Sequence, residues 1–80
     1  MKRIRFEPSV SAEIRAIDQP TAMQILTALH RHAATGEGKV RPLSGEFEGL
    51  LRLRVGNHQV LFVESEETIT VHRVRRDAYR

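Results

Sequence analysis

The sequence predicts a small α+β protein in which a helical hairpin packs on one face of a mostly antiparallel, four-stranded sheet. Three observations predict it. A short alternating segment opens the chain, apolar residues recur at helical spacing through residues 9–34, and three strand-like segments separated by turn signals fill the second half. The expected order is β-α-α-β-β-β. With 80 residues, the chain has room for one core, so we expect a single domain over residues 1–80.

The first half of the chain carries one short strand and two helices. Residues 2–7 read KRIRFE, in which Ile4 and Phe6 alternate with arginines, as in a strand with one buried face. The segment 9–17 then changes to helical spacing, with apolar residues at Val10, Ile14 and Ile17.

A second helix is expected over about residues 20–34. Pro20 suits a first helical turn, and Gly36 suits the position just after a helix end. The apolar residues of this segment follow a helical stripe: Ala22, Ile25, Leu26, Leu29 and Ala33.

The second half begins with an irregular stretch over residues 39–49, punctuated by proline and glycine. Strands are then expected over 50–55, 58–64 and 69–74. In the first of these, the leucines and the valine alternate with Arg52 and Arg54, so the arginines project from the opposite face. The residues expected to be mostly buried are Val10, Ile14, Ile25, Leu26, Leu29, Leu51, Leu53, Leu61, Val63 and Val71.

Composition excludes several classes of site. The chain has no cysteine, which excludes disulfides and thiolate metal sites, and its histidines lack a metal-binding spacing. No glycine-rich phosphate loop is present, so we expect no cofactor. We see no secretory signal and no apolar run of roughly 20 residues, which favours a cytoplasmic protein without a membrane partner.

Positive charge is concentrated near the C-terminus. The net charge is +3, and residues 52–80 contain no lysine but contain Arg52, Arg54, Arg73, Arg75, Arg76 and Arg80. Neighbouring guanidinium groups repel one another and match phosphate oxygens, so an anionic partner is expected. Tyr79 adds an aromatic ring that can stack on a base, which points to single-stranded RNA. The alternative is a solvated sheet face followed by a frayed tail.

Proton transfer is open to more than one group. His58 and His72 lie on predicted strands, and a neutral imidazole can act as a general base near pH 7. Glu46, in the loop before the arginine-bearing strand, is a carboxylate candidate. The alternative for each of these residues is an ordinary surface position, which is the usual one for a lone histidine and for an acidic residue in a loop.

The motifs resemble those of one family. The segments LSG, LRLRVGNHQVLF and RRDAY, together with QPTAMQILTALHRHA, are similar to RelE/ParE-superfamily toxins of bacterial type II toxin–antitoxin systems, and the resemblance covers nearly the whole chain. It implies the same α+β fold and a cognate antitoxin as partner. The RelE branch implies a metal-independent mRNA interferase: an endoribonuclease that cuts messenger RNA at the ribosome through attack by a ribose 2′-hydroxyl. The ParE branch implies gyrase inhibition instead, and an inactive toxin that binds its antitoxin is a third reading.

The resemblance also assigns roles to residues. Arg52 and Arg54 match two basic positions of the family, which are lysines in some relatives, and here they would bind phosphate because arginine stays protonated. The family's C-terminal arginine corresponds to Arg75 or Arg76, and Tyr79 matches a terminal tyrosine that stacks on a base. His58 and Gln59 stand where relatives often have an aromatic residue and an arginine. His58 is therefore the candidate replacement for a missing base.

Overall fold

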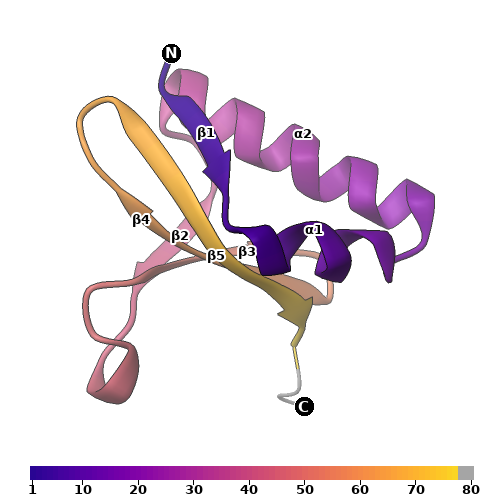
Figure 1. Ribbon diagram of the computed structural model, residues 1–80. Helices are drawn as coiled ribbons and strands as arrows, with labels where there is room; N and C mark the ends of the chain where they lie inside the picture. The colour runs from indigo at the N-terminus through magenta and orange to yellow at the C-terminus, as the bar shows by residue number, and fades with distance from the viewer. Residues whose placement is uncertain (78–80) are drawn as a thin grey trace.

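The computed structural model describes residues 1–77, which form two helices, five strands and one short 3-10 helix (Figure 1). The predicted α+β class is confirmed. In chain order the elements are β1 (Arg3–Phe6), α1 (Pro8–Arg15), α2 (Gln19–Thr35), β2 (Lys39–Pro42), η1 (Gly45–Phe47), β3 (Leu51–Val55), β4 (His58–Glu64) and β5 (Thr68–Arg76).

The five strands form one sheet in the order β1-β5-β4-β3-β2. β1 runs parallel to β5, while all the other neighbours are antiparallel. The N-terminal strand therefore sits beside the last one, and the two helices form the crossover between β1 and the rest of the sheet. β2 and β3 lie at the other end of the sheet, so β3 is flanked on both sides.

The expectation of four strands is wrong, because Lys39–Pro42 forms a fifth. Val40 pairs with Leu53 of β3, and its neighbours Lys39 and Arg41 project to the other face. The segment is only four residues long and ends in a proline, so the sequence resembles a loop. A proline is tolerated there because β2 is an edge strand.

Both helices cover the same face of the sheet, and the chain reverses direction between them (Figure 1). Asp18 begins α2: its carboxylate accepts hydrogen bonds from the Thr21 backbone N–H (3.2 Å) and hydroxyl (2.9 Å), which hold the pKa of Asp18 below its ordinary value. Gly36 ends α2 in a left-handed conformation with φ of 81°, as predicted. Within residues 1–77, neither helix is both long and apolar enough to cross a membrane.

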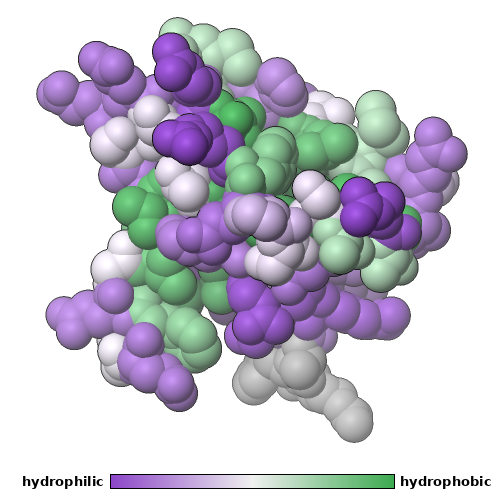
Figure 2. All heavy atoms as spheres, viewed as in Figure 1, coloured by the Kyte–Doolittle hydropathy of each residue, from purple (hydrophilic) through white to green (hydrophobic). Residues whose placement is uncertain are grey.

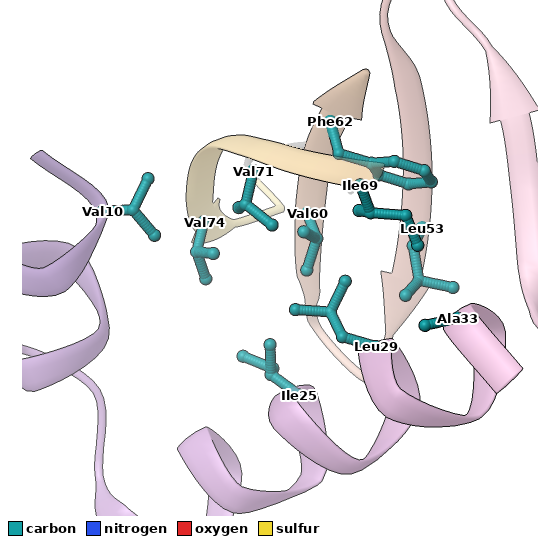
Figure 3. Close-up of a cluster of buried hydrophobic side chains, with 10 residues drawn as sticks. All are labelled: Val10, Ile25, Leu29, Ala33, Leu53, Val60, Phe62, Ile69, Val71 and Val74. Carbon is teal, nitrogen blue, oxygen red and sulfur yellow. The ribbon is translucent and has the colours of Figure 1, made fainter. Parts of the chain in front are cut away.

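The core lies between the helices and the sheet. Figure 3 shows Ile25, Leu29 and Ala33 of α2 pointing toward the strands, with Val10 of α1 beside them. The strand residues that complete this cluster are Leu53, Val60, Phe62, Ile69, Val71 and Val74. Of the residues predicted to be buried, Ile14, Leu26 and Leu51 are only half-buried. Figure 2 shows that hydrophobic side chains also reach the surface between hydrophilic ones.

The prediction for Val63 is wrong, since this side chain is 41% exposed. Residues 60–63 are all apolar, so the sequence does not show which alternate pair faces the helices. In the structure Val60 and Phe62 do so, and Leu61 and Val63 project from the opposite face. Leu61 is nevertheless only 2% exposed, which means that this face is partly covered near the middle of the sheet.

Candidate functional site: a cationic sheet face

The face of the sheet that points away from the helices collects positive side chains from three strands. Arg41 lies directly opposite Arg52, and Lys39 lies directly opposite Arg54. The row continues from Arg54 through Gln59 of β4 to Arg75 of β5. Directly paired residues of a sheet project to the same side. We call this surface the cationic face, and it comprises Lys39, Arg41, Arg52, Arg54 and Arg75.

The clustered positive charges of the cationic face favour the binding of an anion. Like charges directly opposite each other in a sheet destabilise it, and two such pairs stand side by side across β2 and β3. Lys39, Arg41, Arg52 and Arg54 also line a depression of about 630 Å³, together with Gly38 and Val40. A bound polyanion would relieve the repulsion, and guanidinium groups match phosphate oxygens bidentately.

The two β3 arginines differ in how they are held. Arg52 is half-buried, and its Nε atom is buried without a hydrogen-bond partner among residues 1–77. Arg54 is more exposed, at 42% of its side chain, and its Nη1 lies 3.3 Å from Oδ2 of Asp77. Arg54 Nε also donates a long hydrogen bond, 3.4 Å, to the carbonyl of Gly56. Arg54 is thus held in place at the turn, while Arg52 has an unsatisfied donor.

Arg75, the member of the cationic face on β5, lies near an aromatic ring. Its guanidinium carbon is 6.0 Å from the centroid of Phe47 in η1. Because Arg75 stands two strands away from β3, the loop that carries η1 must fold back over the cationic face to reach it. Gln59 lies between Arg54 and Arg75 and is 9% exposed, so the centre of the row is neutral.

His58 and Arg76 lie on the other face. Each is directly paired with the other, and His58 also pairs with Val55, which packs against the helix-side core. Both line a separate depression beside Asp18, at the junction of the two helices, which Arg75 also borders from its position on β5. The structure therefore groups Arg75, rather than Arg76, with Arg52 and Arg54.

The remaining sequence candidates are engaged elsewhere. Arg73 is paired with Leu61, beside the cationic face, but its guanidinium forms an ion pair with Glu13 of α1 (3.1 Å). His72 Nδ1 lies 3.0 Å from Oε2 of Glu7. Glu46 is exposed in η1, next to Phe47. Tyr79 lies outside the described residues.

The sequence did not indicate three residues of this site: Lys39 and Arg41 of the cationic face, and Phe47 beside Arg75. The alternation in KVR is the signal for the first two, but the proline and glycines that follow make the whole segment resemble a loop. Phe47 carried no signal, since only the folding of its loop brings it to Arg75.

Comparison with known proteins gives a fold and no sequence family. No family model matches the chain, and neither does any curated protein. Solved structures do match over almost the full length. The archaeal RelE–RelB complex from Pyrococcus horikoshii aligns with a TM-score of 0.78 at 16% identity, covering 99% of this chain and 98% of that one.

Two staphylococcal structures agree with this match. The YoeB–YefM complex from Staphylococcus aureus aligns with a TM-score of 0.76 at 16% identity, covering 100% of this chain and 98% of that one. The YoeB dimer from the same organism gives 0.75 at 17% identity, with 99% and 97% covered. The chain therefore has the fold of the RelE-superfamily toxins.

Proposed function

We propose that this protein is the toxin of a type II toxin–antitoxin pair and acts as a RelE-like mRNA interferase. The observation that carries the proposal is the cationic face. Three strands place Arg52, Arg54 and Arg75 on one side of the sheet, with Lys39 and Arg41 extending the surface to the edge. This arrangement occurs in a fold shared with chains of RelE–RelB and YoeB–YefM complexes.

The proposed reaction is attack of a ribose 2′-hydroxyl on the adjacent phosphodiester of messenger RNA, without a metal ion. Arg52, Arg54 and Arg75 would hold the phosphate and stabilise the negative charge that develops on its oxygens. Much of such a rate enhancement comes from positioning. Arginine cannot accept the proton, because its pKa exceeds about 12.

The proposed proton acceptor is the Glu46 carboxylate. Glu46 neighbours Phe47 in η1, and Phe47 lies beside Arg75. His58 and Arg76 face the helix side, and His72 is bound to Glu7, so the proposal gives these three no contact with the reacting phosphate. A group of the ribosome is the other possible acceptor. Tyr79 stays in the proposal as a base-stacking residue.

The proposed partners are an antitoxin, the ribosome and messenger RNA. Relatives of this fold are found in complexes with RelB and YefM, which supports a protein partner of the same kind here. We expect an acidic antitoxin segment to cover the cationic face. Rising salt should then slow association more than it speeds dissociation, and an on-rate independent of salt would contradict this placement.

The test is cleavage of messenger RNA in cells that express the parent or single variants. Arg52→Gln, Arg54→Gln and Arg75→Gln should reduce cleavage, as should Glu46→Gln if it accepts the proton. Arg15→Gln is the matched control, since Arg15 is an exposed arginine on α1. Antitoxin binding and thermal unfolding show whether each variant is folded. Full cleavage by all three cationic-face variants would refute the proposal.

One observation favours gyrase inhibition as a second candidate. Gln59 places a neutral side chain between Arg54 and Arg75, where relatives often carry an arginine. Weaker binding of the phosphate is consistent with a toxin that binds a protein target and does not cleave RNA. Inducing the protein and following translation and DNA supercoiling in parallel separates the two, since loss of supercoiling before loss of translation would select gyrase.

A further inference from the structure

Phe47 is an exposed aromatic residue whose position is set by a tight turn. Around it, the backbone N–H of Glu48 donates to Gly45 O (3.1 Å), Leu50 N–H donates to Phe47 O (3.1 Å), and Leu43 N–H donates to Leu50 O (2.9 Å). These bonds close the loop between β2 and β3 and fix where the ring emerges. The side chain remains accessible to a ligand, since Phe47 is 39% exposed.

The surroundings of this ring are cationic. The Arg75 guanidinium lies 6.0 Å from its centroid, at the outer limit of a cation–π contact. Arg75 belongs to the same row as Arg54, so the ring stands at one end of the cationic face. An exposed ring beside cationic side chains is the arrangement by which proteins bind single strands, with bases on aromatic faces and phosphates on cations.

A purely structural role is the alternative for Phe47. Leu61 projects from this face and is only 2% exposed, and in this alternative Phe47 serves only to cover apolar surface such as Leu61. A leucine at position 47 would cover Leu61 as an apolar side chain but could not stack on a base. The two roles are therefore separable by one substitution.

We infer that Phe47 is a stacking platform for one base of a single-stranded RNA whose phosphate is bound by Arg75 and the rest of the cationic face. This rests on the proposed function, because it presumes RNA as the ligand. It adds a base-binding position within residues 1–77, formed by the loop between β2 and β3.

The test uses the full chain and two labelled probes, followed by fluorescence anisotropy. One is a 2′-O-methyl oligoribonucleotide, which cannot supply the attacking hydroxyl, and the other has the same backbone without bases. Phe47→Leu should bind the base-bearing probe about 5- to 150-fold more weakly, the range for loss of one stacked base, and bind the abasic probe as the parent does. The chain has no tryptophan, so Phe47→Trp adds a single indole, whose emission should be quenched by the base-bearing probe alone.

Phe6 provides the matched control, since it is 40% exposed and lies on β1, at the opposite end of the sheet from β2. Phe6→Leu should leave both affinities unchanged, and Phe6→Trp should show no quenching. Two outcomes would contradict the inference while leaving the proposed function intact, provided that Arg52 and Arg54 are needed for RNA binding. In the first, Phe47→Leu binds the base-bearing probe as tightly as the parent does. In the second, the indole of Phe47→Trp is not quenched at saturation. If Phe47→Leu weakens only antitoxin binding, the ring belongs to a protein interface and the inference is also wrong. Absence of any RNA binding by the parent at low salt would overturn both.

Discussion

The Nε2 atom of His32 lies 3.0 Å from the Oε1 atom of Glu64, and the histidine side chain is only 7% exposed. The other oxygen of Glu64 accepts a hydrogen bond from Lys2 Nζ at 2.6 Å. Nδ1 of the same imidazole lies 3.2 Å from the carbonyl of Glu37. The Glu64 carboxylate, at the end of β4, thus links the N-terminal segment to the end of α2.

This arrangement predicts acid sensitivity centred on Glu64. Burial acts to raise the pKa of Glu64, but the hydrogen bonds from Lys2 and His32 outweigh it and hold the pKa below its ordinary value of 4.5. A lowered folded-state pKa contributes stability that is complete above about pH 4.5 and is lost as pH falls through the folded value. Glu64→Gln should therefore cost roughly 1–3 kcal/mol at pH 7 and progressively less in acid.

Urea unfolding of the parent and of Glu64→Gln across an acid series measures this difference. Glu66→Gln, at an exposed position in the turn between β4 and β5, is the control and should change little. Parallel pH profiles for the parent and Glu64→Gln would show that the carboxylate does not carry the effect.

Substitutions on the two faces of the sheet should differ in their cost to the free energy of unfolding. Leu53 is 1% exposed between the helices and β4, so Leu53→Ala should lower the free energy of unfolding by about 2–5 kcal/mol. Val63→Ala should change it by no more than about 0.5 kcal/mol, because Val63 is 41% exposed. Chemical denaturation measures both, and similar costs at the two positions would contradict the assignment of faces.

Gly38 should tolerate no side chain. Its φ is +133°, and a Cβ atom built there would lie 2.9 Å from Cδ1 of the buried Leu53. Gly38→Ala should destabilise the protein by about 1–3 kcal/mol through backbone strain and overpacking. Gly36→Ala is the comparison. Gly36 also has a positive φ, but a Cβ atom built there would have no neighbouring atom within 4 Å. Thermal unfolding should show the larger loss for Gly38→Ala, and the reverse order would rule out the predicted clash.

The salt dependence of RNA binding should show how many phosphate groups the cationic face contacts. For single strands, the logarithm of affinity falls with the logarithm of salt concentration by about 0.7 per phosphate neutralised. Arg52→Gln and Arg41→Gln should each reduce this slope by about 0.7, whereas Arg15→Gln should not. Titrations of a 2′-O-methyl oligoribonucleotide at several salt concentrations give the slopes. Unchanged slopes in both cationic-face variants would place the RNA elsewhere.

The pattern of residues was enough to predict the layers of this protein. The alternation around Leu53 correctly predicted the inward leucines and outward arginines of β3, and Gly36 correctly predicted the end of α2. These are local properties: side-chain alternation and helix termination depend on neighbouring residues in the chain.

The faces to which individual strand residues project depend on tertiary structure and not on the local sequence pattern. Whether Leu61 or Phe62 faces the helices depends on strand register, because both are apolar. Likewise, adjacent Arg75 and Arg76 are equivalent in sequence, but pairing in β4 and β5 places Arg75 with Arg54 and Arg76 with His58. Strand pairing joins residues far apart in the chain, so it sets which charges share a face, and the sequence alone does not show that pairing.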